Sequence, residues 1–317
     1  MVAPLDFEKN IAELESKLDG LRNFSGGEGV DIAKEVGRLE KKLDRLMHHK
    51  YENLSPWEKV LVARHPERPH YLDFLKGLFD DFEELAGDRV FAEDKALVGG
   101  LARFDGQPVM VLGLEKGHDT ESRIKHNFGM PKPEGYRKAR RLMNMANHFN
   151  LPLITFVDTS GAHPGLEAEE RGQAEAIARS IEAMMNLTIP VVVVVTGEGG
   201  SGGAIAVAVG NQILMLEHAI YSVVSPEGCA SILWRTADKK QEAAAAQKFT
   251  AQDLNALKVI DTIIPEPLGG AHRNHKQAFA SVKMAIKEAL QKMSGKSGDE
   301  LQNERREKFL AMGKVGL

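Results

Sequence analysis

Apolar residues recur at helical spacing over the first fifty positions of the chain. They form two stripes, Ile11, Leu14, Leu18 and Leu21 in the first and Ile32, Val36, Leu39, Leu43 and Leu46 in the second. Between them residues 25–29 read Ser-Gly-Gly-Glu-Gly, which predicts a flexible break. Two short amphipathic helices are marginal in water, so each stripe must be buried. A helical hairpin packed on its own body and an arm that docks on another chain are both open interpretations.

A helix start and a strand pair follow. Ser55, followed by proline and three positions later by Glu58, is typical of a capped helix N-terminus. Residues 96–104 and 108–114 are apolar segments that flank Asp105-Gly106. An Asp-Gly pair adopts the positive φ angles that a two-residue turn requires, so this stretch predicts a β-hairpin.

From residue 134 onward the pattern predicts alternating helices and buried strands. Runs of β-branched residues without polar alternation are typical of parallel strands that are covered on both faces. The predicted helices span residues 134–149, 169–185, 225–235 and 277–292, and the predicted strands span 151–157, 191–195, 213–216, 220–224 and 259–264. We therefore expect an α/β fold. The polar tail from residue 294 to residue 317 is expected to be peripheral.

Composition excludes several classes of protein. The 317 residues carry a formal net charge of −4, which provides no overall attraction to nucleic acid. The apolar run at residues 189–195 is far shorter than the roughly 20 residues of a membrane helix, and the N-terminus does not resemble a secretory signal. Cys229 is the single cysteine, so the chain forms no internal disulfide or cysteine-based zinc site of its own. We expect a cytoplasmic protein with no membrane or nucleic-acid partner and no bound metal.

The strongest candidate for chemistry is a glycine-rich tract. Five of the seven residues from Gly197 to Gly203 are glycine, and the tract follows a predicted buried strand and precedes a predicted Ala/Val-rich helix at residues 204–209. Unpaired N–H groups at the start of a helix stabilise a developing oxyanion. An anion or oxyanion site is the favoured interpretation, and a tight structural turn is the alternative.

A second loop, at residues 157–165, leaves the end of the preceding predicted strand. In a parallel sheet both loops open on the same edge, where such sheets bind their ligands. His163 lies in this loop and could act as a general base, although packing is the more common role for a lone loop histidine.

The glycine tract also permits a different chemistry. Gly199 to Gly203 fits the G-x-S-x-G nucleophile elbow, with Ser201 as the nucleophile. The other members of such a triad would be Asp238, Asp253 or Asp261 together with His272 or His275. A serine hydrolase is therefore the main alternative, and a scaffold that binds partners without catalysis is a third.

Six segments carry a resemblance to a known family. They lie in order along nearly the whole chain, at residues 86–89 (Ala-Gly-Asp-Arg), 127–131 (Asn-Phe-Gly-Met-Pro), 133–139, 197–204, 225–234 and 265–273. Together they resemble the alpha subunits of the bacterial acetyl-coenzyme A carboxylase carboxyltransferase. The resemblance implies a crotonase-like fold of repeated β-β-α units, which agrees with the expected α/β pattern. We accordingly divide the chain into an N-terminal helical arm (1–85), a crotonase-like carboxyltransferase domain (86–293) and a polar tail (294–317).

The same resemblance implies an activity and a set of partners. Such a subunit transfers the carboxyl group of carboxybiotin to acetyl-CoA to give malonyl-CoA, the first committed step of fatty acid synthesis. The biotin is attached to a separate carrier protein, which biotin carboxylase charges. Two alpha and two beta subunits assemble, and the zinc ion belongs to the beta subunit rather than to this chain.

The resemblance also assigns site residues. Gly202 and Gly203 are expected to form the backbone oxyanion hole for biotin. The expected substrate-binding residues are Gly161, Ala162, Gly199, Gly200 and Ser201. The second loop departs from the family pattern, because Ser160 and His163 stand where proline and tyrosine are usual. Backbone donors survive such changes, whereas loop rigidity and any aromatic contact are affected.

Overall fold

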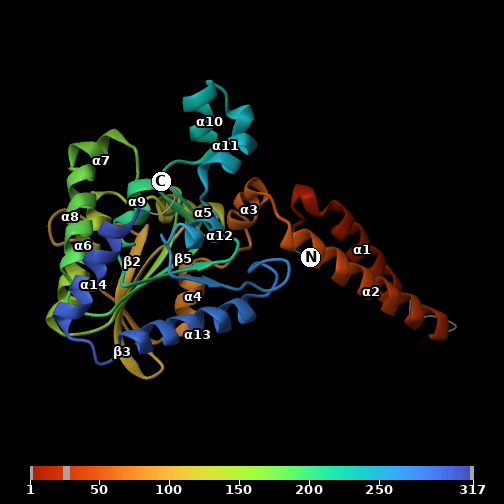
Figure 1. Ribbon diagram of the computed structural model, residues 1–317, viewed down its shortest axis with the longest axis horizontal. Helices are drawn as coiled ribbons and strands as arrows, with labels where there is room; N and C mark the ends of the chain where they lie inside the picture. Colours follow the sequence, from red (N-terminus) through yellow and green to blue (C-terminus); the bar gives the residue numbers. More distant parts are fainter. Residues whose placement is uncertain (1–2, 24–28, 315–317) are drawn as a thin grey trace.

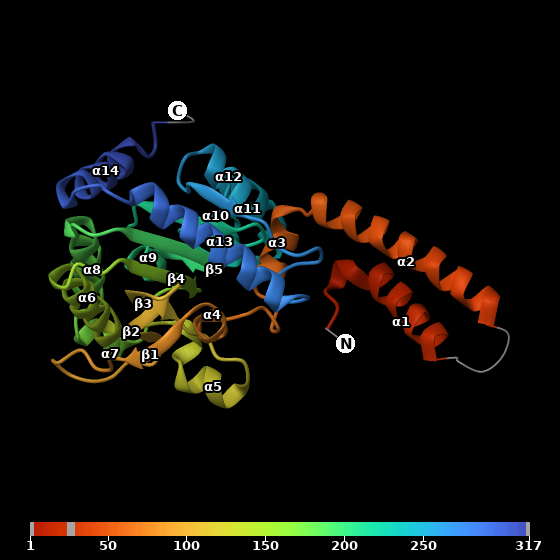
Figure 2. The same ribbon diagram turned by 90° about the horizontal axis from the view of Figure 1, so that it is seen from below.

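The computed structural model describes residues 3–23 and 29–314 of the chain. A pair of long helices projects from an α/β body in which helices cover both faces of one sheet (Figures 1 and 2). The helices of the first half are α1 (Lys9–Asn23), α2 (Gly29–Glu52), α3 (Pro56–Ala63), α4 (Tyr71–Leu78), α5 (Thr120–Lys125), α6 (Pro133–His148), α7 (Leu166–Glu170) and α8 (Gln173–Asn186). Those of the second half are α9 (Ser201–Ile205), α10 (Pro226–Trp234), α11 (Lys240–Gln247), α12 (Ala251–Ala256), α13 (His275–Met293) and α14 (Gly298–Ala311).

The sheet has eight strands in the order β1-β2-β3-β4-β5-β6-β8, and β7 pairs with the far half of β5. Its strands are β1 (Asp80–Glu84), β2 (Leu97–Phe104), β3 (Gln107–Leu114), β4 (Leu153–Thr159), β5 (Val191–Gly200), β6 (Gln212–Leu216), β7 (Ile220–Ser222) and β8 (Thr262–Ile264). The first three strands are antiparallel, and the pairs from β3 onward are parallel. The predicted hairpin is confirmed, because Phe104 pairs with Gln107 across Asp105 and Gly106, which both have positive φ.

Two glycines show how helices approach opposite faces of the sheet. A Cβ atom on Gly113 of β3 would overlap the ring of Tyr71 from α4. On the other face, a Cβ on Gly99 of β2 would meet Leu142 of α6 at 2.8 Å. Because neither position carries a side chain, α4 and α6 pack directly on the strands. Figure 2 shows α6 and α8 at one end of the body and α13 across it.

The N-terminal hairpin buries its stripes in two ways. Its helices pack on each other, and at its base Ile11, Met47 and Tyr51 form a small core with Val62 of α3. Arg273 fixes this base, because its guanidinium donates to Glu8 Oε1 at 2.8 Å and to Glu15 Oε1 at 2.6 Å. The hairpin therefore packs on its own body at its base, and the alternative, an arm that docks on another chain, stays a prediction. The predicted break falls mainly at residues 25–28, outside the described residues.

The predicted domain boundaries differ from the packing in two places. Tyr71 and Phe74 of α4 belong to the main core of the sheet, which favours a boundary after the two long helices rather than at residue 85. The expectation that the tail is peripheral is wrong for α14. Its Arg305 is fully buried and donates to the carbonyls of Met184 and Leu187 at 2.8 and 2.7 Å. These carbonyls lie at the end of α8, where helix geometry supplies no N–H one turn later.

Candidate functional site

The two loops predicted to face one crevice lie against each other in the structure. Thr159 at the end of β4 pairs with Gly199 of β5. A Cβ atom on Gly203 would lie 2.5 Å from the backbone nitrogen of Ala162, and one on Gly200 would overlap the carbonyl of Ser160. The glycines therefore bring the two backbones into contact, and the prediction that both loops open on the same sheet edge is confirmed.

The glycine tract is largely strand rather than loop. β5 continues to Gly200 and pairs with β4 on one side and β7 on the other. A Cβ at Gly199 would meet the ring of Tyr221 at 2.7 Å, and one at Gly197 would overlap the carboxylate of Asp158. Neighbouring groups thus require glycine here for close packing. The assignment of Gly199 and Gly200 as substrate contacts stays a prediction.

The turn from β5 into α9 contains N–H groups that the helix itself does not bond. Ser201 has a φ of 50° and is exposed, Gly202 is half-buried and Gly203 is buried. These residues open the helix, so their N–H groups have no carbonyl one turn earlier to bond. The helix ends at Ile205, so the prediction of a helix over residues 204–209 is wrong. The chain turns instead toward Gly210 and β6.

The second loop holds its own conformation. Thr159 Oγ1 accepts a hydrogen bond from the N–H of Gly161 at 3.0 Å and donates to its carbonyl at 2.8 Å. The Gly161 N–H is therefore engaged within the loop. The backbone nitrogen of Ala162 is the nearest group to the missing Cβ of Gly203.

His163 supports the loop from outside. Its Nδ1 accepts from Asn127 Nδ2 at 3.1 Å, and its Nε2 donates to Glu167 Oε1 at 2.8 Å. Asn127 also donates to the carbonyl of Met130, and both Asn127 and Phe128 have positive φ. The histidine thus ties the loop to a strained backbone segment and is occupied on both ring nitrogens. This geometry favours packing over general-base chemistry.

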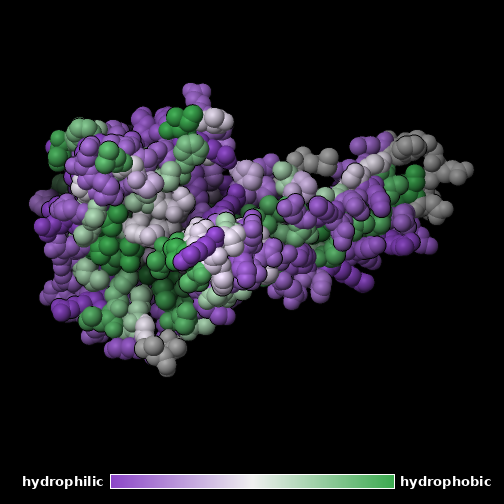
Figure 3. Space-filling view, turned by 90° about the horizontal axis from the view of Figure 1, so that it is seen from above, coloured by the Kyte–Doolittle hydropathy of each residue, from purple (hydrophilic) through white to green (hydrophobic). Residues whose placement is uncertain are grey.

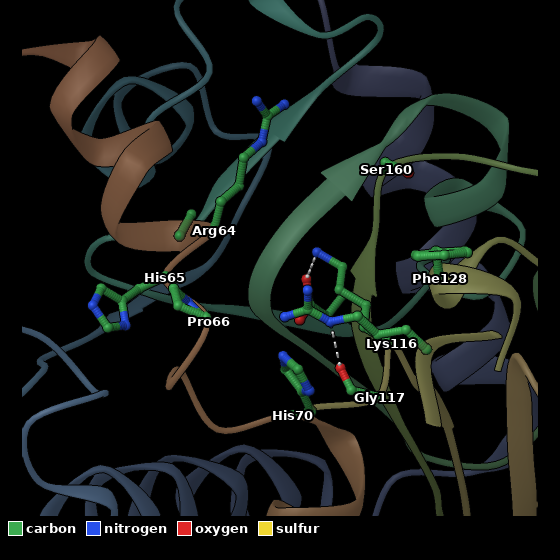
Figure 4. Close-up of a pocket in the computed structure, with 11 residues that line it drawn as sticks. Arg64, His65, Pro66, His70, Lys116, Gly117, Phe128 and Ser160 are labelled. Atoms are coloured by element: carbon green, nitrogen blue, oxygen red, sulfur yellow. Dashed lines mark hydrogen bonds and ion pairs between the residues drawn. The ribbon is translucent and has the colours of Figure 1, made fainter. Parts of the chain in front are cut away.

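A cleft of about 250 Å³ lies below these loops (Figure 4). Phe128 and Ser160 lie on one side, and His65, Pro66 and His70 lie on the other, with Lys116 and Gly117 between them. Lys116 Nζ is 2.6 Å from Asp158 Oδ1, and Asp158 also accepts from the N–H of Glu198 at 2.8 Å. The cleft therefore meets the ends of β4 and β5.

Arg64 of α3 closes the charge network. It donates to both oxygens of Glu198, at 2.6 and 3.1 Å, and to Glu227 at 2.7 Å. Burial alone would lower the pKa of Arg64, but the two carboxylates outweigh burial and raise that pKa above its usual range. Arg64 and Lys116 could not be predicted from the sequence, since no spacing connects them with the glycine tract. Asp158 and Glu198 could have been identified as candidate site residues, because each is a carboxylate beside a predicted buried apolar run.

The geometry does not assemble a serine triad. Among the described residues, no histidine and no carboxylate accepts a hydrogen bond from Ser201. The candidate acids are engaged elsewhere, since Asp253 caps α12 and Asp261 accepts from the N–H of Ile213 at 2.7 Å. His272 is buried and stacks on His65 with ring centroids 3.9 Å apart.

Comparisons with known proteins decide the family. The family model described as acetyl co-enzyme A carboxylase carboxyltransferase-like matches residues 4–313. The acetyl-coenzyme A carboxylase carboxyl transferase subunit alpha of Paramagnetospirillum magneticum is 60% identical over 313 residues, which cover 99% of each chain. The protein of the same name from Sphingopyxis alaskensis is 59% identical over 315 residues, covering 99% of this chain and 100% of that one.

The chain belongs to the acetyl-coenzyme A carboxylase carboxyltransferase alpha subunit family. As a member it is a carboxyltransferase subunit, and the serine hydrolase alternative finds no support. Its fold is crotonase-like, as the resemblance implied.

Solved structures share this fold at low identity. Transcarboxylase 12S has a TM-score of 0.59 at 21% identity, covering 73% of this chain and 43% of that one. A chain of a Pseudomonas malonate decarboxylase hetero-tetramer has a TM-score of 0.55 at 18% identity, covering 66% and 84%.

Within residues 3–23 and 29–314, no group of three or more His, Cys, Asp or Glu side chains is arranged to hold a metal ion. No helix in that part of the chain is long and apolar enough to span a membrane.

Proposed function

We propose that this chain transfers the carboxyl group of carboxybiotin to acetyl-CoA, giving malonyl-CoA, as the alpha half of an alpha–beta carboxyltransferase. The observation that carries the proposal is the 60% identity over 99% of the chain to a protein of that name. The contact of the two backbone loops at Gly203 and Ala162 supports it, because acyl and carboxyl transfer need donors for a developing oxyanion.

Gly202 and Gly203 are the proposed donors to the ureido oxygen of biotin. Ser201, Gly161 and Ala162 form the adjoining wall, and Gly199 and Gly200 lie behind it in β5. Glycine at position 203 lets the two loops approach, since a Cβ there would lie 2.5 Å from the backbone nitrogen of Ala162. Carboxybiotin supplies the carboxyl group when it is bound. The N–H groups of this chain stabilise negative charge on the ureido oxygen, each donor contributing about 3 kcal/mol.

Among the described residues, no carboxylate beside the glycine tract is free of a cation. Asp158 is paired with Lys116, and Glu198 is paired with Arg64. Both carboxylates are occupied by ion pairs and hydrogen bonds, so neither is positioned to take a substrate proton. The proton of the acetyl methyl group is therefore assigned to the departing biotin. The role of this chain is to position groups and to stabilise charge.

Partners complete the proposed enzyme. We assign a beta subunit that contributes most of the acetyl-CoA site and holds the zinc ion, in an assembly of two alpha and two beta chains located in the cytoplasm. The biotin carrier protein and biotin carboxylase supply the carboxyl donor. Exposed apolar side chains around α10 support a protein partner, namely Val223, Ile232, Leu233 and Trp234. Figure 3 looks onto the side where α10 stands out and shows apolar surface gathered over the body, while the arm is mostly polar.

Carboxyl transfer between malonyl-CoA and biotin tests the proposal. The chain alone, the beta chain alone and the purified mixture are compared, with assembly verified by light scattering. We expect transfer in the mixture only. A fully assembled complex that transfers no carboxyl group in either direction would overturn the proposed activity.

A further inference from the structure

The cleft below the glycine loops holds one cation that has no carboxylate partner. Arg123 projects from α5, and its Nε donates to the carbonyl of Gly117 at 3.3 Å. No carboxylate among the described residues lies within 4 Å of its guanidinium. The other two cations of the cleft are paired, Lys116 with Asp158 and Arg64 with Glu198 and Glu227. The terminal nitrogens of Arg123 are therefore available to a ligand.

Arg123 is held in place by the backbone around it. Gly117 has a φ of 79°, and a Cβ there would lie 2.5 Å from the backbone nitrogen of Arg123. The N–H of Gly117 donates to the buried carboxylate of Glu115 at 2.7 Å. The strand end and the start of α5 thus form one tight unit. A guanidinium that is already oriented loses less freedom when it binds an anion.

His70 provides a second observation at the same cleft. Its side chain is about 95% buried, since its relative exposure is 5%, and its Nδ1 has no hydrogen-bond partner in the described part of the chain. The nearest carboxylate oxygen, Glu115 Oε1, is 3.6 Å from that atom. The ring stacks on His118 with centroids 4.3 Å apart and lines the cleft opposite Ser160. A buried polar ring without a partner is costly unless a ligand or water satisfies it.

Burial has the largest influence on the pKa of the His70 ring. It lowers the pKa of the ring, and the nearby His118 and Lys116 lower it further, whereas Asp158 and Glu115 act in the opposite direction. The ring is consequently neutral near pH 7 and offers one N–H donor. Arg123 supplies the charge, and His70 can supply a neutral hydrogen bond.

We propose that this cleft binds the carboxylate of the malonyl group, with Arg123 as its counter-ion and His70 as a further contact. The inference rests on the proposed function and extends it to the recognition of the acyl substrate. A planar guanidinium matches a carboxylate with two parallel hydrogen bonds. Ser160 lines the cleft and adjoins Gly200 of β5, so an anion held here lies beside the loops where the carboxyl group is exchanged.

Phosphate groups of coenzyme A share the anionic chemistry and are the competing source. The cleft volume of about 250 Å³ suits a small carboxylate. Its position at the sheet edge also favours the reacting end of the substrate over the nucleotide end. Acetyl-CoA and malonyl-CoA carry the same phosphates and differ in the terminal carboxylate, so together they separate the two sources.

The test uses the assembled alpha–beta complex with Arg123→Gln, Arg123→Lys and the matched control Lys125→Gln. Lys125 lies on the same helix, is exposed and does not line the cleft. We expect Arg123→Gln to raise the KM for malonyl-CoA about 10- to 100-fold in transfer to biotin, as loss of a charge-assisted pair does. The KM for acetyl-CoA in the forward direction should change less than about twofold. Arg123→Lys should recover part of the loss.

Calorimetry with malonate as the probe measures the affinity of the cleft for a carboxylate in the absence of turnover. Wild-type complex should bind malonate, and Arg123→Gln should lose that binding while still assembling with the beta subunit. Equal rises in both KM values would assign the anion to the phosphates and overturn the proposal, as would an unchanged KM for malonyl-CoA. A wild-type complex that binds malonate through Arg123 but transfers nothing would count against the proposed function alone.

Discussion

A Cβ atom on Gly203 would lie 2.5 Å from the backbone nitrogen of Ala162, whereas a Cβ on Gly202 meets only Ile177, at 3.7 Å. The steric requirement for glycine thus differs between these two neighbouring positions. Gly203 is required by the approach of the second loop, and Gly202 has space for a side chain.

This difference predicts unequal effects of alanine at the two positions. Gly203→Ala should push residues 161–162 away and lower kcat for carboxyl transfer at least about 100-fold, since one displaced oxyanion donor costs that much. Gly202→Ala should lower kcat about tenfold or less. Steady-state transfer by assembled complexes measures both, with sedimentation confirming assembly. Equal effects at the two positions would contradict the geometry.

Substitution of Ser201 tests whether this residue lines the biotin site or acts as a nucleophile. Its φ of 50° suits glycine, so Ser201→Gly should fold normally. We expect kcat/KM to fall less than about tenfold, because the hydroxyl has no base to activate it. Loss of a true nucleophile costs about 10⁴-fold or more. A loss of that size, together with labelling of the wild-type serine by a fluorophosphonate, would revive the hydrolase interpretation.

The hydrogen bonds of Arg305 predict that α14 contributes to the stability of the fold. The side chain is fully buried and donates to the carbonyls of Met184, Leu187 and Ile189 and to Asn211 Oδ1. Arg305→Met would leave these acceptors unsatisfied, so we expect the free energy of unfolding to fall by about 3 kcal/mol. Urea unfolding measures this. The adjacent Arg306 is exposed, and Arg306→Met is the matched control, with an expected change below about 0.5 kcal/mol.

His272 predicts sensitivity to acid. Burial, with the charges of His65, Arg68 and Arg273, lowers the pKa of His272 to about 3. The unfolded ring, with a pKa near 6.5, binds a proton below that pH while the folded ring does not. Stability from this group is therefore present above pH 6.5 and is lost progressively as the pH falls toward 3, by up to about 2 kcal/mol at pH 5.

His272→Phe keeps the stacking on His65 and removes the titration. We expect the slope of unfolding free energy against pH to decrease between pH 6.5 and 5. Chemical unfolding at a series of pH values measures it, and His148→Gln, at an exposed site, serves as the control. An unchanged slope in His272→Phe would assign the acid sensitivity to other groups.

Much of the fold could be predicted because apolar periodicity follows burial closely. The hairpin at Asp105-Gly106 and the buried runs of β4 and β5 are local signals that the tertiary structure preserves. β1 was missed because its sequence, Asp-Asp-Phe-Glu-Glu, is that of an exposed edge strand with no apolar alternation. The strand character of Gly197 to Gly200 was missed because glycine disfavours strands unless neighbours demand a bare backbone.

The glycine loops of the candidate site were predictable and its charges were not. Close contact between backbones requires glycine, and the glycine-rich tract is visible in the sequence. Arg64 follows α3 and is about fifty residues from Lys116 and Arg123 along the chain, so only the packing of α3 and α5 at the sheet edge brings the three to one cleft. Pairings of this kind have no period and no spacing that a single sequence reveals.

The burial of Arg305 has a consequence for how the protein is made. The carbonyls of Met184, Leu187 and Ile189 are synthesised more than a hundred residues before the side chain that satisfies them. While the ribosome is still translating, these groups on the nascent chain depend on water or on a chaperone. Native order at the end of α8 is thus completed only after residue 305 has been synthesised. A premature stop upstream of residue 305 would release a chain whose core is left open.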